Sequence, residues 1–454
     1  MLPLGPTGAG DSPYGTLSAF AGNPLLVSPE RLREEGLLTA GELGEAALPS
    51  RARIDHGAAY ELKPRLLRRA FERLESGAAP ALREEVAAWS AAPEQGGWLA
   101  EWTLFAALRE REGLRAWSAW PEAVRRREPG ALEEARQTLE RELRFHAFVQ
   151  HAFDRQWTRL RATAHAHGID LFGDVPLYLA TDSADLWSRR ELFEIDDDGR
   201  PLKVAGVPPD YFSADGQLWG NPLFRWERVA ADGFGWWIER LRANLRRFDL
   251  VRLDHFRGFA AFWELPAAAP TAREGRWVDG PGRALFAAVR AALGELPLVA
   301  EDLGVITDDV VALRDELGLP GMRVLQFGFG EGASIHLPHQ FTGRVVAYTG
   351  THDNDTTRGW FAGLEPATRR RVLDYLGVTA REVPRALVRA VYASTAELAV
   401  APMQDLLELG SAARTNRPGI PSGNWSWRMR AGAFSDPLAA RLRRLAEVTG
   451  RLSR

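Results

Sequence analysis

The sequence predicts an α/β fold, and within that class a (β/α)8 barrel, for three reasons. After Gly168, short apolar segments alternate with amphipathic helical segments. The short segments are apolar throughout, which is typical of parallel strands that helices cover on both faces. Three of them run into acidic residues, and in such barrels the carboxyl ends of the strands share one mouth, where catalytic groups lie.

Composition excludes several classes of function. The chain has 454 residues, of which 45% are hydrophobic and 26% charged, and its net charge is -3, so neither nucleic acid nor an anionic membrane is an expected partner. The absence of cysteine excludes disulfides, thiol catalysis and cysteine-based metal sites. No apolar run is long enough to span a bilayer, and residues 1–10 lack the pattern of a signal peptide. A cytoplasmic location is therefore expected.

The first 168 residues precede the alternating pattern. Residues 2–4 indicate the end of a strand, and a loop rich in glycine and proline follows. From about residue 52, apolar and aromatic residues recur at helical spacing, and Gly168 is expected to end the last helix. The predicted division is an N-terminal barrel segment (1–50), an inserted helical subdomain (51–146) and the main barrel (147–454), which contains an active-site loop (205–222).

Six strands are expected after Gly168. They cover residues 169–174, 248–254, 296–301, 322–327, 344–349 and 398–402. A helix is expected to begin after Thr307 and end near Gly318, and another to open with Pro384. With residues 2–4 the strands number seven, whereas the barrel requires eight. The sequence therefore suggests that the first β/α unit is missing, with its strand expected before Met1.

The segment FDLVRLDHFRGF (248–259) carries the first group of candidate catalytic residues. Alternate strand residues point to the same face, so Arg252 and Asp254 are expected side by side. An acid and a guanidinium at the end of an apolar strand are costly to bury without partners. Taken alone, the segment is equally consistent with a structural ion pair that caps the strand.

The same construction recurs twice downstream, in LVAEDLG, which carries Glu301, and in VVAYTGTHDND, which carries Asp353. Three carboxylates at one mouth repel each other, which separates their pKa values unless cations pair with them. One acid can then stay ionised and attack while another holds a proton, as in glycosidic chemistry by two carboxylates. Arg252 and His352 are the expected cationic partners.

A metal site is the alternative interpretation of these residues. Good ligands cluster in sequence, namely His352, Asp353, Asp355, Asp254 and His255. No HxH or HExxH spacing accompanies them, which favours the metal-free interpretation.

Longer motifs resemble one family over nearly the whole chain. The chain is similar to the 4-alpha-glucanotransferases, also called amylomaltases or disproportionating enzymes, of the α-amylase superfamily. The resemblance is carried by LPLGPTGAGDSPYGTLSAFAGNPLL (2–26), GDVPLYLATDSADLW (173–187), AGVPPDYFSADGQLWGNPLFRW (205–226), VRLDHFRGF (251–259), AEDLGVIT (300–307), LPGMRVLQF (319–327), YTGTHDNDT (348–356) and PSGNWSWR (421–428).

The resemblance implies a role for each acid. Asp254 would be the nucleophile that forms a covalent β-glucosyl intermediate. Glu301 would protonate the leaving oxygen and then activate the acceptor. Asp353 would stabilise the oxocarbenium-like transition state by holding sugar hydroxyls. Two inversions would retain the α-1,4 linkage, and no cofactor is needed because carboxylates and protons do the chemistry.

The resemblance also implies a set of residues that hold the glucan, with Trp425 completing the wall of the mouth beside Asn424. The substrate-binding candidates are Arg252, His352, Asp174, Tyr14, Ser12, Trp219, Gln217, Phe327 and Asn424. Three of them, Tyr14, Trp219 and Phe327, are candidates for stacking on sugar rings, and core packing is the alternative for each.

The segment 205–222 carries three large aromatic residues, Tyr211, Phe212 and Trp219, which are unusual in a plain surface loop. The resemblance implies a lid over the sugar groove. Such a lid would exclude water and favour a glucan hydroxyl as acceptor, so that transfer exceeds hydrolysis. At Ala9, members of the family commonly have tyrosine, so an aromatic platform outside the main groove is expected to be lost.

The expected partners are maltooligosaccharides, amylose or glycogen-type α-glucans, and glucose. Two other functions stay open from the sequence. One is a glucan-binding protein that is weakly active or inactive because its barrel is truncated, and the other is an α-glucan hydrolase.

Overall fold

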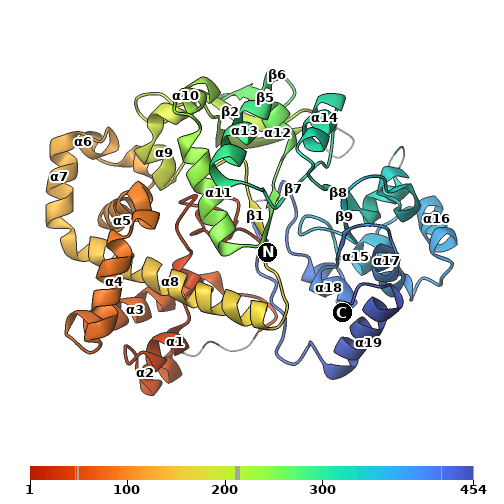
Figure 1. Ribbon diagram of the computed structural model, residues 1–454, viewed down its shortest axis with the longest axis horizontal. Coiled ribbons are helices and arrows are strands. Elements are labelled where there is room, and N and C mark those ends of the chain that lie inside the picture. Colours follow the sequence, from red (N-terminus) through yellow and green to blue (C-terminus); the bar gives the residue numbers. More distant parts are fainter. Residues whose placement is uncertain are drawn as a thin grey trace. The chain divides into compact units, whose positions relative to one another are not determined.

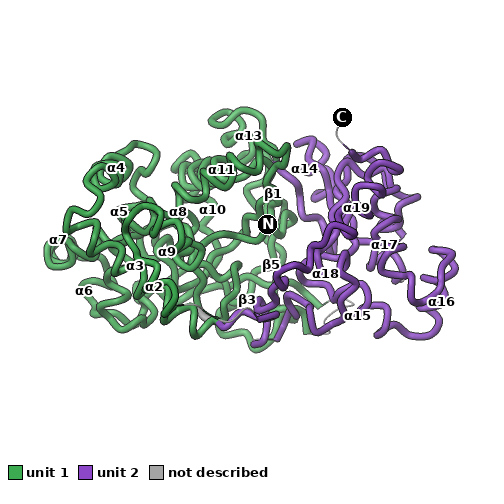
Figure 2. The backbone as a smooth tube through the Cα atoms, turned by 90° about the horizontal axis from the view of Figure 1, so that it is seen from below, with its two compact units in different colours: residues 1–48, 56–297 green, residues 49–55, 298–454 purple. Residues whose placement is uncertain are grey.

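The computed structural model describes residues 1–46, 48, 51–209, 215–330, 332, 334–420 and 422–452. The chain divides into two units, one of residues 1–48 and 56–297 and the other of residues 49–55 and 298–454 (Figure 2). Each unit carries part of the candidate site. The predicted division at residues 50 and 146 follows other boundaries and stays a prediction.

The first unit opens with a series of helices (Figure 1). They are α1 (Pro29–Glu34), α2 (Ala40–Glu45), α3 (His56–Glu75), α4 (Pro80–Ala91), α5 (Gly96–Arg111), α6 (Glu122–Arg125), α7 (Pro129–Thr138) and α8 (Glu140–Ala166). The helical pattern is interrupted between α7 and α8, where Leu139 has a φ of -107° and a ψ of 19°. Gly168 follows α8 with a φ of 68°, a left-handed conformation that glycine adopts freely, so the predicted helix end is confirmed.

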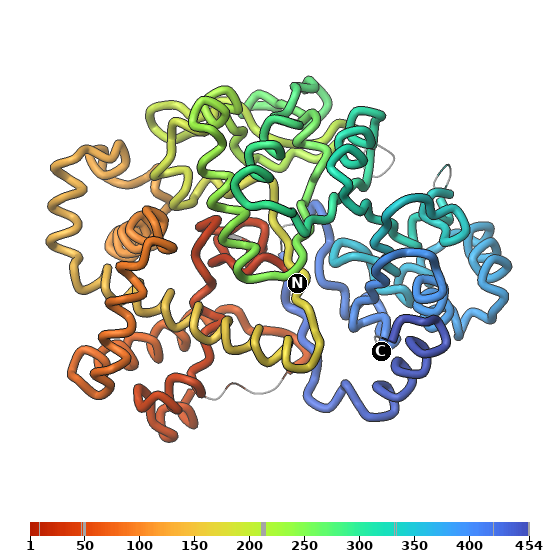
Figure 3. Tube along the Cα trace, viewed as in Figure 1, coloured from red at the N-terminus to blue at the C-terminus, as the bar shows by residue number. Residues whose placement is uncertain are grey.

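Two parallel strands of the first unit carry the candidate residues. β1 (Phe172–Val175) pairs with β4 (Leu250–Leu253), and the register places Asp174 opposite Arg252. Between them come α9 (Ala184–Ser188), α10 (Trp226–Ala231) and α11 (Gly235–Arg247). In Figure 3 the chain passes from yellow α8 into β1 and returns through green α11 to β4. Parallel strands joined by helices confirm the expected alternation of strands and helices in this part of the chain.

A four-stranded antiparallel sheet lies in the same unit, in the order β3-β2-β5-β6. Its strands are β2 (Lys203–Val207), β3 (Gln217–Pro222), β5 (Ala261–Pro266) and β6 (Arg276–Asp279). Short α12 (Arg257–Ala260) leads into β5, and α13 (Gly282–Leu293) follows β6. The expected loop at 205–222 is therefore partly strand, because β2 pairs with both β3 and β5. Tyr211 and Phe212 lie outside the described residues.

The second unit repeats the parallel arrangement. Strands β8 (Gly321–Val324), β9 (Val345–Tyr348) and β10 (Leu398–Val400) form a sheet in which β9 is central, and β7 (Leu298–Ala300) precedes them. The helices of this unit are α14 (Asp308–Glu316), α15 (Thr357–Ala362), α16 (Pro366–Leu376), α17 (Val383–Tyr392), α18 (Met403–Leu406) and α19 (Asp436–Val448). Val345, Ala347 and Leu387 belong to one buried cluster between the sheet and its helices.

Several predictions about local structure have clear outcomes. The helix after Thr307 and the left-handed Gly318 that follows it are confirmed, as is Pro384 in the first turn of α17. Residues 2–4 do not form a strand, because Leu4 accepts its backbone bond from Asn23 in a loop rather than from a ladder. The strand expected at 322–327 ends at Val324, and residues Leu325–Phe329 form a 3-10 helix.

The helices within the described ranges also include none that combines the length and the apolar character of a membrane span.

Candidate active site

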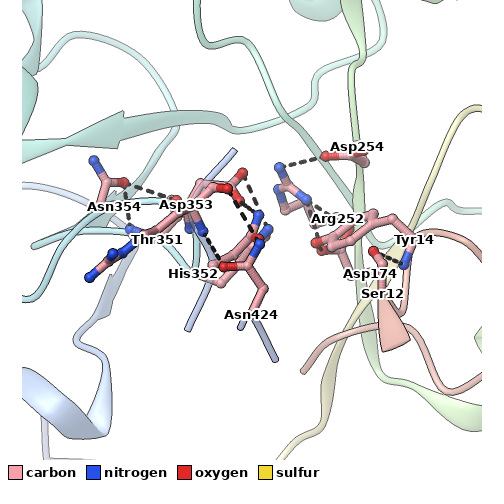
Figure 4. A network of polar contacts seen from close by, with 12 residues as sticks. Ser12, Tyr14, Asp174, Arg252, Asp254, Thr351, His352, Asp353, Asn354 and Asn424 are labelled. Atoms are coloured by element: carbon pink, nitrogen blue, oxygen red, sulfur yellow. Dashed lines mark hydrogen bonds and ion pairs between the residues drawn. The ribbon is translucent and has the colours of Figure 1, made fainter. Parts of the chain in front are cut away.

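The first half of the site is built around Arg252 on β4. Its Nη1 donates to both carboxylate oxygens of Asp174 at 2.9 and 2.8 Å, and its Nη2 lies 2.7 Å from Oδ1 of Asp254. One guanidinium thus bridges two acids, as expected from its planar fork of donors (Figure 4). The Asp174 side chain is 6% exposed, whereas that of Asp254 is 26% exposed. Asp174 is therefore the buried anchor, and Asp254 the reachable carboxylate.

The backbone holds Asp254 at the end of its strand. Asp254 N donates to the carbonyl of Val175 at 3.0 Å, which continues the ladder between β1 and β4 past Leu253. The residue after it, His255, has a φ of 52°, which is uncommon for a side chain with Cβ. The chain therefore turns away from the strand direction directly after Asp254, which leaves that carboxylate at the strand end.

Tyr14 joins the same network from the N-terminal loop. Its hydroxyl donates to Oδ2 of Asp174 at 2.6 Å, and its backbone N donates to Oγ of Ser12 at 3.3 Å. Burial of the phenol and the negative charge of Asp174 raise the pKa of Tyr14 well above its ordinary value. The hydroxyl therefore stays protonated and acts as a donor. The predicted residues Ser12, Tyr14, Asp174, Arg252 and Asp254 are brought together in this unit.

An aromatic cluster forms around His255, the residue that follows Asp254. The Trp219 ring lies edge-on to the His255 ring with their centroids 4.7 Å apart, and Tyr178 lies 6.2 Å from each. Trp219 is 37% exposed, and its Nε1 donates to Oε1 of Gln217 at 3.2 Å. Trp219 is thus held by its neighbours yet keeps an accessible surface, as a sugar-stacking residue requires.

His255 is neutral in this cluster. Burial, together with the positive charges of Arg257 and Arg252, lowers the pKa of His255 to about 3. The ring therefore supplies shape and polar contact next to Asp254 without adding a positive charge.

In the second unit, Glu301 directly follows β7. Its Oε1 accepts a hydrogen bond from Leu303 N at 3.0 Å, which orients the carboxyl group. The neighbouring Asp302 is buried, and it accepts from Met322 N at 2.6 Å and from Arg314 Nη1 at 2.6 Å. Asp302 therefore ties the end of β7 to β8 and α14, and it limits the movement of Glu301.

His352 and Asp353 lie in the turn that follows β9. His352 Nε2 lies 3.4 Å from Oδ2 of Asp353, whose side chain is 45% exposed. Asn416 Nδ2 donates to Oδ1 of Asp353 at 2.6 Å, and Arg414 Nη2 donates to its carbonyl at 2.6 Å. The predicted pair of His352 and Asp353 is thus confirmed as a contact, and residues 414–416 hold it from the other side.

Asn424 lies in a loop next to this turn (Figure 4), and Trp425 follows it in the chain. The Asn424 amide binds its own loop, because Oδ1 accepts from Arg417 N at 3.0 Å and Nδ2 donates to the Ile420 carbonyl at 2.8 Å. Trp425 lies with its ring centroid 5.7 Å from that of His352. Asn424 thus shapes the loop, and Trp425 packs beside His352. Their expected place in the wall of the mouth stays a prediction.

Phe327 lies in the 3-10 helix after β8, with its ring centroid 5.6 Å from that of His336. His336 Nδ1 accepts a hydrogen bond from Val324 N at 3.2 Å, so this nitrogen carries no proton. Burial and the charge of Arg323 lower the pKa of His336 to about 4, in agreement with that role. Phe327 is half-buried, so its predicted stacking on sugar stays a prediction.

The residues of the alternative metal site are occupied by other contacts. Asp355 accepts from Ser411 Oγ at 2.6 Å and from Thr356 N at 2.7 Å, which makes it part of a turn. Among the described residues, the group that brings three potential ligand atoms together is His165, Asp170 and Asp249 instead. Asp249 already accepts from Arg161 and from Leu171 N there. This group ties α8 to β1 and β4.

Sequence reasoning missed several residues that support the site. Asn416 and Arg414 contact Asp353 from 63 and 61 residues away in the chain. Asp405 is buried and accepts from Thr349 Oγ1 at 2.6 Å and from Thr357 Oγ1 at 2.8 Å. No local sequence pattern marks Asn416 or Arg414 as partners of Asp353, because the contacts join segments that are distant in the chain.

Comparison with known proteins gives one consistent result. Residues 1–434 match the family model described as 4-alpha-glucanotransferase. The chain is 50% identical to a 4-alpha-glucanotransferase of Thermus thermophilus, covering 100% of this chain and 91% of the relative. It is 44% identical to that of a Synechocystis strain, covering 99% and 90%.

Solved structures agree with the sequence comparison. An amylomaltase from Streptococcus agalactiae in complex with acarbose superimposes with a TM-score of 0.94 at 34% identity, covering 99% of this chain and 91% of that one. An amylomaltase from Corynebacterium glutamicum has the same fold, with a TM-score of 0.77 at 18% identity, covering 98% of this chain and 69% of that one.

Proposed function

The chain belongs to the 4-alpha-glucanotransferase family, and from that premise we propose that it moves a segment of an α-1,4-glucan to the 4-hydroxyl of another glucan or of glucose. Donors and acceptors would be maltooligosaccharides, amylose or glycogen-type glucans. The transfer would retain the α configuration through a covalent β-glycosyl ester on Asp254.

The observation that carries the proposal is the bridge that Arg252 makes between Asp174 and Asp254. A carboxylate paired with a guanidinium stays ionised, and the partial exposure of Asp254 lets it reach an anomeric carbon. Asp174 accepts hydrogen bonds from the other terminal nitrogen, Nη1, and so fixes the orientation of the guanidinium. This arrangement suits a nucleophile better than a proton donor.

Glu301 supplies the proton in the proposed reaction. In the first step the bond from the anomeric carbon to the glycosidic oxygen breaks, that oxygen takes the proton of Glu301, and Asp254 forms the ester. In the second step Glu301 takes the proton of the acceptor hydroxyl, whose oxygen displaces Asp254 from the anomeric carbon. Both carboxyl groups return to their starting states, so the cycle uses only protons and carboxylates.

Asp353 would bind sugar hydroxyls and favour the distorted ring of the transition state, with His352 beside it. We propose that the parallel strands of both units belong to one (β/α)8 barrel whose mouth collects Asp254, Glu301 and Asp353. Support comes from parallel pairing within each unit, since the acids follow the carboxyl ends of β4, β7 and β9. Retention of the anomeric configuration then requires that the carboxyl groups of Asp254 and Glu301 lie about 5–5.5 Å apart.

Trp219 and Gln217 on β3 are proposed to cover the donor sugar. A cover that excludes water leaves the ester to a glucan hydroxyl, which favours transfer over hydrolysis. Tyr14 and Phe327 are the further stacking candidates, and Ser12 supports Tyr14 through its backbone.

Incubation of the protein with maltotriose tests the proposal. A transferase yields glucose and a ladder of longer maltooligosaccharides while the number of reducing ends stays constant. A hydrolase raises reducing ends steadily without the ladder. Retained maltotriose binding with no new product would identify a glucan-binding protein without turnover and overturn the proposal.

A further inference from the structure

A cavity of about 250 Å³ in the second unit is lined by three arginines, Arg53, Arg414 and Arg417. The other residues in its wall are Ser411, Ile420, Ser422, Gly423 and Asn424. A water molecule takes up about 30 Å³ in the liquid, so the cavity has room for a polyatomic ligand. We propose that this cavity binds a phosphate group, either as free phosphate or as the phosphate ester of a small sugar.

Two of these arginines donate hydrogen bonds to neutral groups. Arg53 donates from Nη1 to Ser426 Oγ at 3.0 Å and from Nη2 to the Ala412 carbonyl at 3.0 Å. Arg414 donates to two backbone carbonyls, those of Asn416 at 2.7 Å and Asp353 at 2.6 Å. Every one of these acceptors is neutral, so neither guanidinium is paired with a carboxylate through these bonds.

Arg417 adds a third charge. Its backbone is held in place, because Arg417 N donates to Oδ1 of Asn424 at 3.0 Å, while its side chain is exposed. Within the described ranges, none of the three guanidiniums forms an ion pair with a carboxylate. Like charges that share a cavity repel each other, and a bound anion removes that cost.

The local sequence shows the same charge imbalance. Residues 409–435 contain four arginines and no aspartate or glutamate, although the whole chain has a net charge of -3. The cavity is therefore positive because its own segment lacks acids. A neutral α-glucan can accept hydrogen bonds from guanidiniums, but only an anion also neutralises their uncompensated charge.

Phosphate fits this set of donors. The planar guanidinium binds phosphate oxygens through paired N–H groups, and this geometry makes arginine the common residue for the task. The Ser422 hydroxyl at the cavity wall can donate as well. Ser411 is committed elsewhere, because its hydroxyl donates to Asp355 at 2.6 Å.

Titration calorimetry of the full chain with inorganic phosphate, at low ionic strength, tests the proposal. Saturable binding is expected, and Arg417→Gln and Arg53→Gln should each weaken it by about tenfold or more, because each removes charge-assisted hydrogen bonds. Arg370→Gln is the matched control, since Arg370 is an exposed arginine on α16 in the same unit, and it should leave binding unchanged. Thermal unfolding shows whether each variant is folded.

Two further ligands identify the source of the phosphate. Tighter binding of glucose 1-phosphate or glucose 6-phosphate than of inorganic phosphate assigns a sugar ester, and equal affinity assigns free phosphate. Either result supports the site. Absence of saturable phosphate binding overturns the proposal. Equal competition by chloride at the same ionic strength would also overturn it. The proposal fails as well if the two variants change only the binding of maltotriose, because the cavity would then be a sugar subsite.

Discussion

The side-chain amide of Asn416 donates to Oδ1 of Asp353 at 2.6 Å, across 63 residues of the chain. His352 lies on the other oxygen of the same carboxylate, at 3.4 Å from Oδ2. One group on each side fixes the plane of the carboxylate. Asp353 is therefore presented in a defined orientation before any sugar binds.

Asn416→Ala should lower kcat/KM for maltotriose by about tenfold to a hundredfold, because a hydrogen bond to a charged group is worth about 1.5–3 kcal/mol. The loss should fall mainly on kcat if Asp353 acts in the transition state. Initial rates of glucose release measure both constants. Unchanged kinetics in a variant that unfolds at the wild-type temperature would contradict a role for Asn416 in orienting Asp353.

Asp254→Asn should abolish transfer, because an amide cannot form the glycosyl ester. Glu301→Gln should fail on maltotriose but still form the covalent intermediate from α-maltosyl fluoride, whose leaving group needs no proton. Mass spectrometry of the intact protein detects the ester. Asp170→Asn, which changes an exposed acid of the first unit, serves as the control. A covalent adduct in Asp254→Asn would assign the nucleophile to another residue.

Trp219→Ala should raise KM for maltotriose more than it lowers kcat, and should increase the hydrolysed fraction, because the ring would cover the donor sugar. Trp219→Phe keeps an aromatic face and should restore most of the affinity. Reducing-end and ladder assays on the same samples separate hydrolysis from transfer. If hydrolysis stays at its wild-type share in Trp219→Ala, then β3 does not exclude water.

His336 should make the protein less stable as the pH falls. Its folded pKa of about 4 lies below the ordinary value near 6.5, so the unfolded chain binds the proton first. Its contribution is fully present above pH 6.5 and is lost toward pH 4, by up to about 1.4 kcal/mol per pH unit.

Denaturant unfolding at pH 7 and pH 5 measures this effect. His336→Gln should show a smaller drop in the free energy of unfolding between the two pH values than the wild type. The exposed His339→Gln is the control and should keep the wild-type drop. An equal drop in all three proteins would show that His336 is not the group that titrates.

Local patterns predicted much of the fold and part of the site. Apolar segments became parallel strands at Leu250–Leu253, Leu298–Ala300 and Val345–Tyr348, because strand formation there follows from residue type and burial. Alternation along β4 placed Arg252 and Asp254 on one face, and they form the predicted ion pair. The expected strand at residues 2–4 failed because a strand needs a partner, which a single segment does not reveal.

The acids at the strand ends could be located from the chain itself, because each directly follows a short apolar segment whose residue type indicates a buried strand. Tertiary structure alone decided which groups hold those acids. Asn416 reaches Asp353, Tyr14 reaches Asp174 and Trp219 reaches His255 only after distant segments pack together. Such contacts depend on the directions of side chains and on distances of a few ångströms between them. The residues next to each of these positions in the sequence do not predict them.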